Sequence, residues 1–255
     1  MVAQLVGQPM PWVWWLALPL SVWVIYTTDH LLDAYRLQAR ASTPRHRFHH
    51  RHFRPIALLW GLGLLSCLSW IPWLAPPRLL WFGLGMGGLV LLHLGLVFLV
   101  KDRTSLLLIK ELGVGGIYAA GVWGGPLVLH PEHWPPGVGA WFGQFFLLAM
   151  INLLAFSMYE HDIDERDGHT SFVRAIGLGR TRRLILGLGL GVLALGAWRG
   201  GVGAQAAGVQ GVYALMLGVL WLVSFQPHWF APGERYRIWG DAVFFLPGLL
   251  WLGGG

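Results

Sequence analysis

Residues 159–170 read YEHDIDERDGHT, and this stretch directly follows a long apolar run. It places five of the chain's twelve acidic residues within eight positions. If the preceding helix continues, Glu160, Asp164 and Asp167 fall at i, i+4 and i+7 and share one face. Because like charges stacked on one face repel each other, we expect a cation to lie between them.

A second acidic segment, residues 29–33 (DHLLD), ends an earlier apolar run and again places two carboxylates at i and i+4. It aligns with residues 160–164 as acid-His-x-x-Asp. Two carboxylate faces at two helix ends offer the hard oxygen ligands that Mg²⁺ prefers, and a bound diphosphate can complete the coordination shell. The predicted metal ligands are Asp29, Asp33, Glu160, Asp164 and Asp167.

The composition is that of a membrane protein. Hydrophobic residues make up 55% of the 255 residues and charged residues 12%, about half the charge of an average soluble domain. The mean hydropathy is +0.56. Runs long enough to cross a bilayer occur at about 10–34, 55–74, 78–100, 104–129, 138–160, 180–198, 206–226 and 236–254. We therefore predict an all-α, polytopic membrane helical bundle of about eight transmembrane helices, forming one domain over residues 1–255.

The positive residues indicate the orientation. Most of the 18 Lys and Arg residues fall in alternate loops, which places both acidic segments on the cytoplasmic side. We expect a multi-pass protein of a bacterial inner (plasma) membrane. The net charge of +6 is then explained by the membrane topology. Its basic side chains contact membrane lipids, and the charge does not indicate binding to nucleic acid. Cys67 is the single cysteine, so no internal disulfide is possible.

The basic stretch 45–55 (RHRFHHRHFRP) contains the His-rich segment 46–52 and has three interpretations. The first interpretation is a cap that holds phosphates, the second is a positively charged loop that contacts anionic lipid, and the third is a binding site for a transition metal. The loop that contacts lipid is the favoured one.

Polar residues within the apolar runs are the remaining candidates. Lys110 either points into a polar cavity toward a substrate phosphate or extends to the interface. Asn152 and Tyr159 share a face with Glu160 and either line that cavity or are satisfied within the bundle. Asp241 either pairs with a neighbouring base, Arg235 or Arg237, or contributes to the metal site.

With these motifs in view, the chain resembles the UbiA superfamily of intramembrane prenyltransferases, whose two aspartate-rich motifs are NxxxDxxxD and DxxxD. Asp29-xxx-Asp33 matches the end of the first motif, and Glu160-xxx-Asp164 matches the second, with Gly168 and Thr170 behind it. Residues 106–110 (LLLIK) look like the family's YxxxK segment. The chain departs from the family in having Ile25 in place of Asn, Glu160 in place of Asp and Leu106 in place of Tyr.

The resemblance implies a function. It is the Mg²⁺-dependent transfer of a prenyl group from a prenyl diphosphate to an acceptor within the membrane, which is an aromatic ring or another lipid-soluble group. The implied catalytic residues are Asp29, Asp33, Glu160, Asp164 and Lys110. The implied substrate-binding residues are Asn152, Tyr159, Arg36, Arg174 and Thr170. The resemblance names no acceptor, chain length or oligomeric state.

Two other functions stay open. A non-catalytic membrane protein with a UbiA-like fold would use the acidic cavity to bind a metal, a lipid phosphate or a partner. A cation or proton transporter is less favoured, because its carboxylates would lie near the bilayer midplane rather than at the interface.

Overall fold

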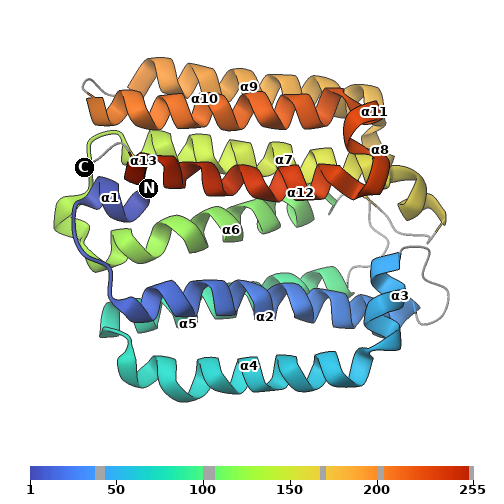
Figure 1. Ribbon diagram of the computed structural model, residues 1–255, viewed down its shortest axis with the longest axis horizontal. Helices are drawn as coiled ribbons and strands as arrows, with labels where there is room; N and C mark the ends of the chain where they lie inside the picture. The colour runs from blue at the N-terminus through green and yellow to red at the C-terminus, as the bar shows by residue number, and fades with distance from the viewer. Residues whose placement is uncertain (38–43, 100–106, 167–170, 200–203, 253–255) are drawn as a thin grey trace. The chain divides into compact units, whose positions relative to one another are not determined.

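The computed structural model describes residues 1–37, 44–99, 107–166, 171–199 and 204–252, and every regular element in these ranges is a helix (Figure 1). Six of the helices in these ranges are long and apolar enough to cross a membrane: α4, α5, α6, α7, α9 and α10. The predicted all-α class is confirmed, and the chain is a multi-pass integral membrane protein.

The helix bounds follow the predicted apolar runs closely. The elements are α1 (Val2–Val6), α2 (Trp12–Leu37), α3 (Pro44–Arg51), α4 (Phe53–Leu74), α5 (Pro77–Leu99), α6 (Leu107–Leu129), η3 (Pro131–His133), α7 (Val138–Arg166), α8 (Phe172–Ile176), α9 (Leu178–Arg199), α10 (Ala204–Phe225), α11 (Pro227–Phe230), η4 (Pro232–Glu234), α12 (Arg235–Ala242), η5 (Val243–Gly248) and α13 (Leu249–Leu252). Two differences stand out. The run 236–254 is divided among α12, η5 and α13, with Pro247 inside η5, where it removes a backbone donor. The His-rich stretch, expected to be a loop, forms the short helix α3.

The chain forms two compact units. The first unit comprises residues 1–8, 102–162 and 170–255, and the second unit comprises residues 9–101 and 163–169. The division falls within α7, so that helix contributes its long apolar part to the first unit and its last turn to the second.

The core of the first unit is built around α7, which is drawn between α6 and the pair α9 and α10 in Figure 1. Leu148 and Ile151 of α7 are fully buried, as are Trp123 of α6 and Tyr213 of α10. The Tyr213 hydroxyl donates a hydrogen bond to the backbone oxygen of Trp141, 3.0 Å away. A buried tyrosine needs such a partner because an unpaired hydroxyl in an apolar interior is costly.

A pair of amides joins three helices of this unit. Gln144 of α7 and Gln210 of α10 donate to each other's side-chain oxygens at 2.9 and 3.0 Å. The Gln144 Nε2 atom also donates to the backbone oxygen of Val192 in α9, 2.9 Å away. Hydrogen bonds of this kind between transmembrane helices contribute about 0.6–2 kcal/mol each. They fix the register of α7 against α9 and α10.

The contact between α9 and α10 gives a stability prediction. A Cβ atom at Gly189 would lie 2.5–2.7 Å from ring atoms of Trp221, whereas one at Gly187 would meet nothing within 4 Å. We expect Gly189→Ala to lower the free energy of unfolding by about 1–3 kcal/mol, because an indole ring cannot yield as a flexible side chain does. Thermal unfolding in detergent measures this effect. Gly187→Ala is the matched control, and equal stability of the two variants would contradict the close approach.

The second unit is organised by α2, which packs against α3 and α4. The Trp60 Nε1 atom of α4 donates to the Thr28 hydroxyl oxygen of α2 at 2.8 Å, and Thr28 in turn donates to the Val24 backbone oxygen at 2.7 Å. At the other end of the two helices, Trp12 and Trp70 stack with ring centroids 6.2 Å apart. No residue of α4 is buried, so its exposed leucines form an apolar surface suited to lipid.

Candidate functional site

The first acidic segment lies in the last turns of α2. Asp29 is exposed, and the i, i+4 spacing puts Asp33 on the same face of this helix. The next residue, His30, is 4% exposed, and its ring lies 4.1 Å from that of Tyr26 and 4.8 Å from that of His49 in α3. These contacts hold α3 beside the acid-bearing end of α2.

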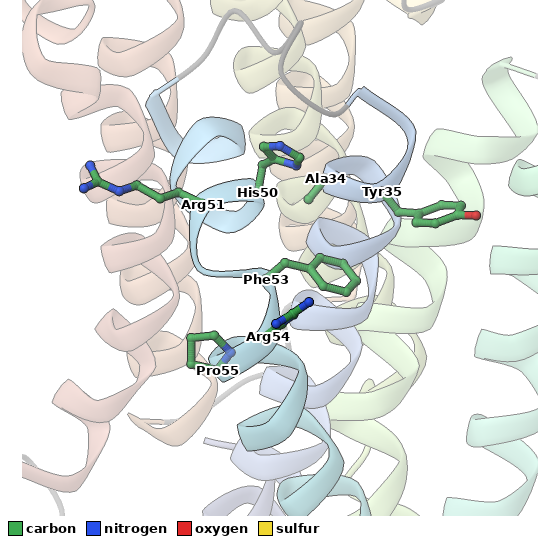
Figure 2. Close-up of a pocket in the computed structure, with 7 residues that line it drawn as sticks. All are labelled: Ala34, Tyr35, His50, Arg51, Phe53, Arg54 and Pro55. Carbon is green, nitrogen blue, oxygen red and sulfur yellow. The ribbon is translucent and has the colours of Figure 1, made fainter.

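A pocket of about 460 Å³ lies where α2, α3 and α4 meet. Figure 2 shows His50, Phe53 and Arg54 between the end of α2 and the start of α4, with Tyr35 and Arg51 directed outward on opposite sides. The complete lining is Ala34, Tyr35, His50, Arg51, Phe53, Arg54 and Pro55. The Arg54 guanidinium and the His50 imidazole make this pocket suitable for an anion such as a phosphate group. Its α2 residues, Ala34 and Tyr35, directly follow Asp33 in the sequence, whereas its basic residues belong to α3 and the start of α4.

The second acidic segment is the C-terminal part of α7, and it packs against α12. The Glu160 carboxylate forms an ion pair with the Arg237 guanidinium and accepts a hydrogen bond from the Tyr236 hydroxyl at 3.4 Å. The Tyr159 ring stacks on the Tyr236 ring with centroids 4.3 Å apart. Asn152 lies against Gly240 of the same helix, since a Cβ atom there would meet the Asn152 side-chain oxygen. The prediction that Asn152, Tyr159 and Glu160 share a face is confirmed.

Arg237 supplies a cation to Glu160, one of the carboxylates predicted to share a face of α7. Its Nε atom also lies 3.3 Å from Glu234, and its guanidinium carbon lies 5.6 Å from the Phe156 ring centroid and 5.4 Å from that of Tyr236. The side chains of Arg237 and Glu160 are only 19% and 23% exposed. A pair this shielded from water is held more firmly than a surface pair.

This arrangement bears on the predicted metal site. Glu160 would have to leave Arg237 before it could bind Mg²⁺, so its role as a metal ligand stays a prediction. Tyr159 is also engaged, because its hydroxyl donates to the Val223 backbone oxygen at 2.6 Å. Asn152 is 7% exposed, and its side-chain oxygen has no hydrogen-bond partner among the described residues. Among Asn152, Tyr159 and Glu160, Asn152 is therefore the residue whose side-chain oxygen is still available to accept a hydrogen bond.

The other predicted residues are placed as follows. Lys110 is exposed in the first turn of α6, nearer to the helix end than its sequence position suggested. Arg174 lies in α8, where its backbone nitrogen donates to the Ser171 hydroxyl oxygen that caps the helix, at 3.4 Å. Asp167 and Thr170 lie outside the described residues. Asp33, Arg36 and Asp164 have described backbone positions in α2 and α7, while their side chains lie outside the described part.

The structure thus gathers part of the predicted site. Asn152, Tyr159 and Glu160 meet on one side of α12 in the first unit, to which Lys110 and Arg174 also belong. Asp29, Asp33 and Asp164 belong to the second unit, as does the basic pocket. Convergence of the two acidic segments over one metal stays a prediction.

Sequence reasoning missed the partner of Glu160. The sequence offered Arg237 and Arg235 as neighbouring bases for Asp241, and it gave no sign that Arg237 contacts Glu160 of α7. The i, i+3 spacing of Glu234 and Arg237 did indicate that this guanidinium has an acidic neighbour on the preceding turn.

Comparison with known proteins gives no assignment: no family model, no curated protein and no solved structure matches this chain.

Proposed function

We propose that the chain is a Mg²⁺-dependent intramembrane prenyltransferase of the UbiA type, which transfers a prenyl group from a prenyl diphosphate to a lipid-soluble acceptor. One observation carries the proposal. A pocket of about 460 Å³ with a basic lining adjoins the acid-bearing end of α2 within one compact unit. Cations for phosphate oxygens and carboxylates for a divalent metal are the two components that diphosphate binding needs.

The residues divide into two groups by their chemistry. The carboxylates of Asp29, Asp33, Asp164 and Asp167 are the proposed metal ligands, and the solvent exposure of Asp29 supports its place among them. The proposed basic groups for the diphosphate are His50 and Arg54 of the pocket, together with Arg36, Lys110 and Arg174. Thr170 is a proposed hydrogen-bond donor to the same anion. Glu160 and Tyr159 hold α7 against α12.

The reaction breaks the carbon–oxygen bond between the prenyl group and the diphosphate and forms a bond from the same carbon to the acceptor, which loses a proton. When bound, Mg²⁺ neutralises the charge of the departing diphosphate. The basic side chains share that charge. The apolar helices exclude water, so that the prenyl group reaches the acceptor before it is hydrolysed.

The proposal includes a topology. In this topology two further segments span the membrane in addition to the six apolar helices. They are α2, which has 26 residues, and the C-terminal run formed by α12, η5 and α13. With these the chain crosses a bacterial inner membrane eight times, and both acidic segments face the cytoplasm.

A second candidate is a non-catalytic protein that binds a lipid phosphate or a metal. The engagement of Glu160 by Arg237 and Tyr236 favours it, since a carboxylate in an ion pair is not available as a ligand.

One assay separates the two candidates. Purified protein in liposomes is incubated with Mg²⁺, labelled prenyl diphosphates of several lengths and a membrane lipid extract as the source of acceptor. We expect diphosphate release and a labelled lipid product. Binding of the labelled diphosphate without release in every mixture would favour the second candidate.

The basic pocket gives a binding prediction of its own. Arg54→Gln should weaken binding of magnesium pyrophosphate about 10- to 100-fold, because a hydrogen bond to a charged group is worth about 1.5–3 kcal/mol. Isothermal titration calorimetry on the purified protein measures this change. Arg78→Gln, at the start of α5 in the same unit, removes an equal charge elsewhere and serves as the control. Equal affinities for the two variants would exclude the pocket as the phosphate site.

A further inference from the structure

The connection between α6 and α7 is a short, well-anchored loop over residues 130–136 (HPEHWPP). Its first part forms η3, in which the His133 nitrogen donates to the His130 oxygen at 3.0 Å. The His130 nitrogen donates to the Pro126 oxygen of α6 at 3.2 Å, and the Trp134 indole donates to the Leu127 oxygen at 2.8 Å. Three prolines restrict the backbone further. These contacts restrict the backbone from which the side chains of the loop extend.

Three potential metal ligands meet on this loop. The Glu132 Oε1 atom lies 3.1 Å from Nδ1 of His133 and 3.8 Å from Nδ1 of His130. Ligand atoms of the three residues all lie within 4.8 Å of one another, and within the described ranges no other group of three His, Cys, Asp or Glu residues is so placed. The side chains of His130, Glu132 and His133 are 22%, 56% and 45% exposed, so an ion can reach them from solvent.

The spacing of these atoms suits one class of metal. A tetrahedral ion with bonds of about 2.0–2.1 Å holds its ligands about 3.3 Å apart, which falls between the two observed separations. Two imidazoles and one carboxylate are ligands that Zn²⁺ accepts, and they leave a fourth position for water. Mg²⁺ is excluded by its preference for oxygen ligands in octahedral geometry.

We propose that His130, Glu132 and His133 form a binding site for a Zn²⁺-type divalent ion at the loop that joins α6 to α7. The loop precedes the first residue of α7, Val138, and Glu160 lies 22 residues further along that helix, about 33 Å by the helical rise. The proposal uses none of the residues of the proposed diphosphate site. A bound ion links the side chains of His130, Glu132 and His133 and thereby stabilises the turn between α6 and α7.

The test is a Zn²⁺ titration of untagged protein in detergent at pH 7.5, in competition with a chromogenic chelator. Removing only an outer partner of a metal ligand weakens binding about 10- to 100-fold, so we expect His133→Ala to lose one bound equivalent or to weaken it at least tenfold. His161→Ala is the matched control, because His161 also contacts a carboxylate, Asp162 at 3.2 Å, but forms no group of three. The His161→Ala variant should still bind one equivalent of Zn²⁺ with unchanged affinity.

Two further measurements address the obvious alternatives. A variant with His49, His50 and His52 changed to alanine should still bind the one Zn²⁺ equivalent assigned to the loop. This result distinguishes the loop site from ions bound by the His-rich segment. Zn²⁺ should also raise the Tm of the wild type and of His161→Ala but not that of His133→Ala, because only a protein that binds the ion when folded is stabilised by it. Equal Zn²⁺ binding and equal Tm shifts in His133→Ala and wild type would overturn the proposal and leave the loop an ion-paired cluster only.

Discussion

Asp33→Ala will lower Mg²⁺-dependent prenyl transfer in membranes at least about a thousandfold, and Asp164→Ala will do the same. A metal at a departing diphosphate contributes several kcal/mol of transition-state stabilisation, and about 4 kcal/mol corresponds to three orders of magnitude in rate. Each substitution removes one ligand from the metal, so either one alone should suffice. The measurement is the initial rate of labelled lipid product formation at saturating Mg²⁺.

A matched control lies in the same stretch. Asp162 is exposed on α7, and its carboxylate lies 3.2 Å from the His161 ring nitrogen, so Asp162→Ala removes an equal charge without removing a proposed ligand. It should retain most of the activity. Undiminished turnover in Asp33→Ala or Asp164→Ala, with Asp162→Ala equally active, would defeat the metal assignment.

Arg237→Met will lower the free energy of unfolding by about 2–3 kcal/mol. The substitution leaves the Glu160 carboxylate in a site that is only 23% exposed, and a charge deprived of its partner there keeps its desolvation cost. Arg235→Met is the control, since Arg235 is an exposed neighbour on α12 and should change stability little. Thermal unfolding in detergent, followed by circular dichroism, measures both variants.

The double variant Glu160→Gln/Arg237→Met separates pairing from packing. Removing both charges should recover part of the stability lost in Arg237→Met, so that the double-mutant cycle yields a coupling energy of about 1–3 kcal/mol. Strictly additive effects would show that the two side chains do not stabilise each other. The lost stability would then come from the contacts that Arg237 makes with Phe156 and Tyr236.

The apolar runs predicted most helices because length and hydropathy alone determine what can cross a bilayer. The run 138–160 predicted α7 from its first residue, and the helix continues through the acidic stretch to Arg166, which meets the condition for Glu160 and Asp164 to share a face. Asp167, the third residue of that predicted face, lies outside the described residues. The last run was harder to predict. Pro247 breaks it, and a hydropathy average does not register the loss of one backbone donor.

Tertiary partners were the part that the sequence could not supply. Glu160 and Arg237 are 77 positions apart, and nothing local to either residue indicates the other. The same holds for Gln144 and Gln210, whose amides join α7 to α10. Shared faces on one helix could be predicted, as they were for Asn152, Tyr159 and Glu160, because they depend only on the helical period.

The basic pocket was predicted in part. The positive charges of residues 45–55 suggested contact with phosphates, but they were expected on a loop. The stretch instead forms α3, whose His49 packs against buried His30 of α2, and this contact places His50 and Arg54 at the pocket. The signal for a helix was the absence of glycine from the stretch between Pro44 and Pro55.

The central claim is that Asp33 of α2 and Asp164 of α7 meet over one pocket. The most direct measurement is the distance between nitroxide labels at Asp33→Cys and Asp164→Cys, in a background where the single native cysteine, Cys67, is replaced by serine. Ligands of one or two shared metal ions lie within a few ångströms of each other, so we expect a label distance below about 20 Å. A distance of about 30 Å or more, comparable to the thickness of the bilayer core, would contradict the claim.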